Sequence, residues 1–266
     1  MLKPIGGLGN RLYAMASGRE FAMNQGRNLT IFWPLRWELN ARFTDYWETN
    51  GFNIVYIDEY NAPWRWLNKP RVVERMLSAS AEVISDSAMY RIRDEIGGYD
   101  FENYLQKYVN TRKLFIETCF NFYPKRSVGL DKIFFPKPII VNIVNHWLTI
   151  NKDDFIGLHI RRTDHANSIA SSPNELFSQI IELNPQKKFF LCTDDIETEN
   201  YFKNKYPNKI LTFSKNKARN SNSGMLEAII DLILLSKSEI IYGSFNSTFS
   251  SFAADYGNKK LIVLQK

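Results

Sequence analysis

Strand-like and helix-like segments alternate regularly through the second half of this 266-residue sequence, and this alternation constrains the fold more than any other feature. Each strand-like segment is a short, continuously apolar run, which is typical of strands buried on both faces of a parallel sheet. Such a sheet is covered by helices on both sides, so we expect a doubly wound α/β arrangement. The expected strands are 154–162, 187–192, 209–213, 239–243 and 260–264, and the expected helices are 139–149, 173–183, 196–206, 224–237 and 246–257.

The first half of the sequence is less regular. It opens with a short strand and a glycine loop, 6–10, and residues 70–110 give no clear assignment. Residues 124–138 hold three prolines and mixed charge, so we expect a linker there. The sequence therefore predicts two lobes, 1–135 and 136–266. Further expectations for the first lobe are a helix at 11–24, strands at 29–33 and 113–120, and an irregular, aromatic-rich segment at 34–60.

Composition indicates a globular protein with an anionic partner. The net charge is +6, which suits a nucleotide, a nucleic acid or a membrane surface, although solubility explains it equally well. Cys119 and Cys192 lie in short apolar runs, so we expect buried free thiols and a reducing compartment. The N-terminus does not resemble a signal peptide, and no apolar run approaches about 18 residues. We expect a cytoplasmic protein, with peripheral contact to the inner membrane face as an option.

Polar side chains collect where three of the expected strands end. Ligands of open parallel sheets bind beyond the carboxyl ends of the strands, so these segments are expected to meet at one edge. They are 159–165, 193–195 and 243–248.

A pair of arginines is the most informative feature of this edge. Arginine grips phosphate oxygens in a bidentate fork, so Arg161 and Arg162 suit a diphosphate. Strand alternation puts Arg162 on the opposite face from Arg161. A structural ion pair of Arg162 with Asp164 or Asp194 is the alternative.

Two further features point to a nucleotide. The segment around Ser247 and Thr248 opens a helix, whose N-terminus binds phosphate through free N–H groups, although simple N-capping also explains these residues. Asp231 lies mid-helix among isoleucines and leucines, where a carboxylate needs donors. The N1–H and 2-amino groups of guanine would supply two. Glu227 lies one turn earlier on the same helix face. It either shares this guanine-binding role or lies at the solvated edge of the helix.

No metal site is expected. Asp194 and Asp195 are adjacent but have no clear partner ligand, and the three histidines lack metal-binding spacing, so orienting roles are favoured. The glycine loop is neither a P-loop nor a complete dinucleotide fingerprint. It still permits close approach to a sugar or phosphate at Gly9, with Asn10 and Arg11 facing a cleft between the lobes.

The order, spacing and residue types of these motifs resemble the α1,2-, α1,6- and protein O-fucosyltransferase superfamily, and most of all the nodulation-type α1,6 enzymes. The opening segment also resembles the start of bacterial α1,2 enzymes. The resemblance covers the second lobe and the first dozen residues, and the middle of the first lobe matches nothing we can name. The matching segments are 6–12, 159–164, 190–195, 223–236 and 243–250.

The resemblance implies a GT-B-like fold of two Rossmann-like lobes, with an acceptor-side lobe at 1–135 and a GDP-sugar-binding lobe at 136–266. It implies inverting, metal-independent transfer of fucose from GDP-β-L-fucose to a glycan hydroxyl, in polysaccharide or lipopolysaccharide biosynthesis, without a cofactor. By position, Arg161 would grip the β-phosphate, Ser247 would bind phosphate, and His159 and Asp231 would hold guanine. The implied catalytic set is Arg161, Arg162, Asp164 and Asn10, and the implied donor-binding set is His159, Arg161, Asp194, Asp195, Asp231, Ser247, Thr248, Gly9 and Arg11.

One departure leaves the catalytic base open. In the α1,6 enzymes of higher organisms, a glutamate that follows the arginine motif is thought to be the base, and Ile169 stands at that position here. Asp164, His165, Glu175 or an acid of the first lobe are candidates, or no base is needed because the arginines stabilise the departing GDP.

Three alternatives remain open at this point. Another GDP-sugar, such as GDP-mannose or a GDP-deoxyheptose, fits the same motifs, because none of them reads the sugar. A catalytically silent nucleotide- or glycan-binding module fits the missing glutamate. A nucleic-acid binder is disfavoured, because the tryptophans are not interleaved with basic residues.

Overall fold

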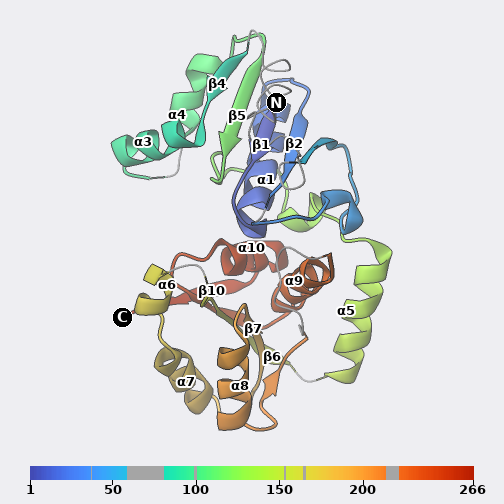
Figure 1. Cartoon of the computed structure of the whole chain (residues 1–266), viewed down its shortest axis with the longest axis vertical. Helices are drawn as coiled ribbons and strands as arrows, with labels where there is room; N and C mark the ends of the chain where they lie inside the picture. The colour runs from blue at the N-terminus through green and yellow to red at the C-terminus, as the bar shows by residue number, and fades with distance from the viewer. Residues whose placement is uncertain (37, 59–80, 99–100, 153, 164–165, 214–221) are drawn as a thin grey trace. The chain divides into compact units, whose positions relative to one another are not determined.

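The computed structural model describes residues 1–36, 38–58, 81–98, 101–152, 154–163, 166–213 and 222–266. The chain divides into two compact units, Met1–Phe135 and Pro136–Lys266, which we call the N-terminal and C-terminal units. Each contains a parallel sheet with five described strands, in the orders β3-β2-β1-β5-β4 and β10-β9-β6-β7-β8 (Figure 1). The α/β class and the GT-B-like fold expected from the sequence, with a parallel sheet in each unit, are confirmed.

The C-terminal unit follows the predicted alternation closely, apart from the short helix α6, which was not expected, and a strand β8 of only two residues. Its strands are β6 (Phe155–Ile160), β7 (Lys188–Thr193), β8 (Ile210–Leu211), β9 (Ile240–Ser244) and β10 (Lys260–Leu264). Its helices are α5 (Pro138–Ile150), α6 (Ala166–Ser171), α7 (Asn174–Leu183), α8 (Ile196–Lys205), α9 (Asn222–Leu235) and α10 (Thr248–Gly257).

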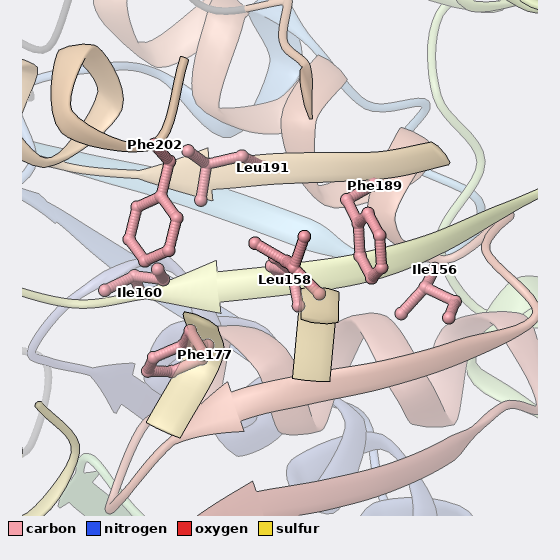
Figure 2. Packing of buried hydrophobic residues seen from close by; sticks show 8 residues of the cluster. Ile156, Leu158, Ile160, Phe177, Phe189, Leu191 and Phe202 are labelled. Atoms are coloured by element: carbon pink, nitrogen blue, oxygen red, sulfur yellow. The ribbon is translucent and has the colours of Figure 1, made fainter. Parts of the chain in front are cut away.

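The central strand β6 is buried on both faces, which explains its continuously apolar sequence. Ile156, Leu158 and Ile160 face α7 and α8, where they pack against Phe177 of α7 and Phe202 of α8 (Figure 2).

The intervening residues of β6 face the other helices. Phe155 contacts Trp147 of α5, and Gly157 lies so close to Leu235 and Ser238 that a Cβ atom at this glycine would be 2.7 Å from each. His159 continues this face at the carboxyl end of the strand.

The N-terminal unit contains more structure than the sequence predicted. Strand β3 and helix α3 fall in segments read as irregular or left unassigned. The local signals for α3 were present, because the Ser85 hydroxyl caps the helix at Ala88 N and Gly97 ends it with a φ of 66°. The elements are β1 (Leu2–Pro4), α1 (Leu8–Asn24), β2 (Thr30–Leu35), β3 (Asn53–Asp58), β4 (Glu82–Ile84), α3 (Asp86–Ile96), α4 (Glu102–Leu105) and β5 (Leu114–Thr118), with 3₁₀ turns at Phe43–Asp45, Gln106–Tyr108 and Leu130–Lys132.

The proline-rich segment 124–138, where we expected a linker, is mostly exposed but also contributes buried side chains to the N-terminal unit. Phe134 is fully buried and packs against Phe43, Trp47 and Phe52, with ring centroids 5.9–6.3 Å apart. Leu130, Ile133 and Phe134 thus belong to the core of the N-terminal unit, whereas the other residues of the segment are exposed or half-buried. A boundary between the units follows Phe135.

Both cysteines are free, as expected. Cys192 is buried, whereas Cys119 at the end of β5 is half-buried. Asp86 accepts a hydrogen bond from the backbone N–H of Cys119 at 2.8 Å, and the hydroxyl of Tyr90 lies 3.7 Å from its Sγ. Burial, together with the charge of Asp86, raises the pKa of Cys119 to about 11.

No helix in the described ranges combines the length and apolar character that a membrane crossing requires.

The contact between α9 and α10 yields a stability prediction. A Cβ atom at Gly257 would lie 2.0 Å from the backbone oxygen of Ser236, which no side-chain adjustment can relieve. Gly257→Ala should therefore lower the free energy of unfolding by about 3 kcal/mol. Hydrogen–deuterium exchange with mass spectrometry reads this loss in the C-terminal unit. Gly98→Ala is the control, because no atom lies within 4 Å of the added Cβ. Equal exchange in both variants would contradict the prediction.

The pKa of Cys119 gives a second prediction. With a pKa of about 11, only about 0.1% of the thiol is ionised at pH 8, so alkylation should be slow there and should accelerate up to pH 11. Asp86→Asn removes the charge that raises the pKa, so alkylation at pH 8 should become faster. Peptide mass spectrometry separates Cys119 from buried Cys192. An alkylation rate that already levels off near pH 9 would refute the shift.

Candidate functional site

The strand order of the C-terminal unit creates a switch point between β6 and β9. The chain leaves β6 toward β7 on one side, whereas β9 pairs with β6 on the other side and continues to β10. Connections that diverge in this way open a crevice beyond the carboxyl ends of the two strands, where ligands of open α/β sheets bind. The residues at this point are Arg161–Thr163, after β6, and Phe245–Ser247, after β9.

Hydrogen bonds join these two strand ends. The backbone N–H of Arg161 donates to the Ser244 hydroxyl at 3.1 Å, and this hydroxyl donates to the carbonyl of His159 at 3.3 Å. Ser244 is buried, and Arg161 is half-buried. The backbone of Arg161 is therefore held beside the loop that leads into α10.

The His159 side chain forms a second connection between the same elements. Its Nδ1 atom lies 3.3 Å from the Ser247 hydroxyl, and its ring stacks on Phe249 of α10 with centroids 4.9 Å apart. The Ser247 side chain contacts His159 instead of capping α10, so the first N–H groups of this helix receive no side-chain cap from it. Thr248, the first residue of α10, is exposed.

Arg162 has a different position from Arg161. Its guanidinium donates to the backbone oxygens of Arg161 (2.8 Å) and Ser172 (2.9 Å) and to the side-chain oxygen of Asn174 (2.6 Å). Burial lowers the pKa of Arg162, and nearby carboxylates, first among them Asp194, oppose this shift. The side-chain contacts of Arg162 thus lie on the α7 side of the site, and a catalytic role for this residue stays a prediction.

The adjacent aspartates hold the backbone around the site. Asp194 accepts the backbone N–H of Arg162 at 2.7 Å and the hydroxyl of Thr163 at 2.8 Å. Asp195 caps α8 by accepting from the backbone N–H of Thr198 at 2.8 Å. These contacts are orienting contacts of the kind favoured from the sequence, and a donor-binding role for either carboxylate stays a prediction.

Asp231 of α9 is buried with 4% exposure, in agreement with its apolar sequence neighbours. The Cys192 thiol donates to its Oδ2 atom at 3.7 Å. Glu227 is half-buried. The predicted residues Asp164 and His165 lie outside the described residues.

The residues predicted from the glycine loop lie in the N-terminal unit. Gly9 and Asn10 belong to the first turn of α1, and Asn10 packs against Gly6, which has a φ of 82°. Arg11 is fully buried, donates to the carbonyls of Gly6 and Pro34, and lies over the ring of Trp33. These contacts lie within the N-terminal unit, and the expectation that Arg11 faces a cleft stays a prediction.

Ser172 is a site residue that sequence reasoning missed. It is fully buried, donates to the carbonyl of Leu264 at 2.6 Å, and accepts the backbone N–H of Phe245 at 2.7 Å. It thus connects the loop before α7, which Arg162 also holds, to the loop after β9. A serine before a proline and a helix reads as an ordinary cap, so no sequence signal indicates these distant partners.

No group of three or more His, Cys, Asp or Glu side chains within the described part of the chain is arranged to hold a metal ion.

No protein-family model matches the sequence, and no curated protein matches it either. Solved structures do match. The fucosyltransferase NodZ from Bradyrhizobium has a TM-score of 0.63 at 17% identity, over 95% of this chain and 90% of that chain. A mutant of Arabidopsis thaliana FUT1 in complex with GDP has a TM-score of 0.60 at 13% identity, over 98% and 69%. POFUT1 in complex with GDP has a TM-score of 0.55 at 14% identity, over 99% and 97%.

NodZ has also been crystallised with GDP and soaked with GDP-fucose, and it is described as an α-1,6-fucosyltransferase. The match extends over nearly the whole chain, including the part of the N-terminal unit that the sequence motifs did not cover. This chain therefore has the fold of these enzymes.

The role of Ser172 can be tested by removing its hydroxyl. Ser172→Ala leaves the buried N–H of Phe245 without its acceptor, so the free energy of unfolding should fall by about 2 kcal/mol. The loops at 171–174 and 245–247 should exchange deuterium faster. Ser87→Ala, at an exposed position of α3, should change stability by less than about 0.5 kcal/mol. Unchanged exchange in both loops would show that Ser172 does not connect them.

Proposed function

We propose that this protein is a glycosyltransferase that moves fucose from GDP-β-L-fucose to a hydroxyl group of a glycan, with inversion and without a metal ion. The carrying observation is the switch point of the C-terminal unit, where the residue Arg161 is bonded to the strand that leads into α10. An arginine beside a helix N-terminus offers positive charge and N–H donors to a diphosphate. Similarity to structures that bind GDP or GDP-fucose supports this ligand.

The nucleobase would occupy the side of the site nearest α9. Asp231 is a buried acceptor there, and a guanine offers its N1–H and 2-amino groups to one carboxylate. His159, stacked on Phe249 and joined to Ser247, would line the path from base to phosphate. Thr248 and Ser247 at the start of α10 would receive the phosphates.

In the proposed reaction, the acceptor hydroxyl oxygen forms a bond to C1 of fucose. The bond between C1 and the β-phosphate oxygen breaks, and its electron pair leaves with GDP. Charge develops on the departing diphosphate, so Arg161 and the α10 N-terminus stabilise the transition state more than the ground state. Arg162 and Asp194 act by fixing the backbone of this segment.

The proton of the acceptor hydroxyl needs a recipient. Ile169 carries no proton acceptor, and Glu175 is exposed in the first turn of α7. Asp164 and Asn10 stay in the proposed catalytic group, together with an acid of the N-terminal unit as a candidate base. We assign acceptor binding to this unit. A lipid-linked glycan at the inner face of the cytoplasmic membrane suits the net charge of +6.

Ligand selectivity tests the donor. Isothermal titration should show binding of GDP and no comparable binding of UDP or ADP. GDP-fucose should be turned over with a glycan acceptor mixture in the presence of EDTA. Loss of turnover on adding EDTA would remove the metal-free mechanism. If the protein turns over only GDP-mannose or a GDP-deoxyheptose, the donor sugar is not fucose. If it binds GDP but turns over no donor, it is a binding module and not an enzyme.

The role of Arg161 gives a separate prediction. Arg161→Ala should lower kcat by about 100-fold or more, because it removes a cation from the developing charge on the diphosphate. Circular dichroism should show an intact fold. Arg91→Ala, at an exposed position of α3, is the matched control and should keep full turnover. A kcat within threefold of the unmodified protein would contradict the assignment.

A further inference from the structure

The sheet face toward α9 and α10 carries an unusual pair of side chains. His159 of β6 and Cys192 of β7 are paired in register, so they lie side by side at the carboxyl ends of their strands. Earlier on the same face, Phe155, four residues before His159, and Phe190, two residues before Cys192, pack with Trp147. The face therefore changes from aromatic to polar at the edge where the proposed donor binds.

Cys192 contacts a carboxylate of α9. Its Sγ atom lies 3.7 Å from Oδ2 of Asp231, and the two residues are 5% and 4% exposed. The thiol is the donor and the carboxylate oxygen is the acceptor. A thiol is a weak donor, but in a buried site even a weak hydrogen bond favours one direction of the carboxylate.

We infer that Cys192 is a positioning residue that orients the Asp231 carboxylate toward the nucleobase and thereby sets base specificity. This inference rests on the proposed function, because it takes Asp231 as the acceptor for guanine. Hypoxanthine differs from guanine only by the missing 2-amino group. An oriented carboxylate therefore distinguishes GDP from IDP, whereas a carboxylate that rotates freely pairs less well with two parallel donors.

Two variants at Cys192 separate the donor from the volume of the side chain. Cys192→Val keeps a similar volume in a buried strand and removes the donor. Cys192→Ser keeps a donor. The measurement is the dissociation constant for GDP and for IDP in each protein, by isothermal titration. The ratio of the two constants reports base reading and is insensitive to a uniform loss of site integrity.

We expect Cys192→Val to reduce the preference for GDP over IDP by about fivefold, mainly through weaker GDP binding, and Cys192→Ser to keep most of the preference. Cys119→Val, at the half-buried thiol of the N-terminal unit, is the matched control and should leave the ratio unchanged. If Cys192→Val fails to fold, Cys192→Ala replaces it, with the same expected direction.

A double-mutant cycle shows whether Cys192 acts through Asp231. Asp231→Asn alone should remove most of the GDP preference, and adding Cys192→Val to it should cause no further loss. Additive losses would overturn the inference, as would an equal weakening of GDP and IDP in Cys192→Val. If the unmodified protein binds GDP and IDP equally, Asp231 does not read the base and the inference fails while a diphosphate site survives. If it binds neither, the proposed function itself is wrong.

Discussion

The hydrogen bond from the backbone of Arg161 to the Ser244 hydroxyl connects two strand ends that are 83 residues apart in sequence. It matters because β6 and β9 are neighbours whose following segments diverge, which is where a parallel sheet leaves room for a ligand. Ser244 also donates to the carbonyl of His159, so a single buried hydroxyl fixes the spacing between the arginine segment and the loop before α10. The proposed site is thus a property of the sheet edge, and the surrounding side chains adjust its chemistry.

The C-terminal unit was largely predictable from sequence, because a strand buried on both faces leaves an unmistakable apolar run. The N-terminal unit was not. Strand β3 has mostly exposed or half-buried residues, and it lies amid aromatic residues that suggested irregular structure. Phe134 illustrates a different limit, since nothing local distinguishes a proline-rich linker from a segment whose phenylalanine fills a distant aromatic cluster.

The proposed site was likewise predictable only in part. Residue type and strand position indicated Arg161, His159, Ser247 and Asp231, because polar groups at strand ends and a carboxylate within an apolar helix are visible in sequence. The hydrogen-bond partners of the site residues were not visible in the sequence. Arg162 and Arg161 have identical chemistry, yet the guanidinium of Arg162 holds the loop before α7. Arg11 seemed a ligand in a glycine loop, but its donors meet carbonyls of its own unit. Long-range hydrogen bonds decide these roles, and sequence spacing does not encode them.

The close approach of Gly257 to the backbone of Ser236 has a mechanical consequence. Helix α9 carries Asp231, and helix α10 begins beside Ser247, so a junction without an intervening side chain couples the two ends of the proposed ligand site. Any tilt that brings the carboxyl ends of the two helices closer would be opposed by this contact. The proposed nucleotide site would consequently be preorganised where these helices form it. Entry and exit of the nucleotide would depend on the movement of other segments.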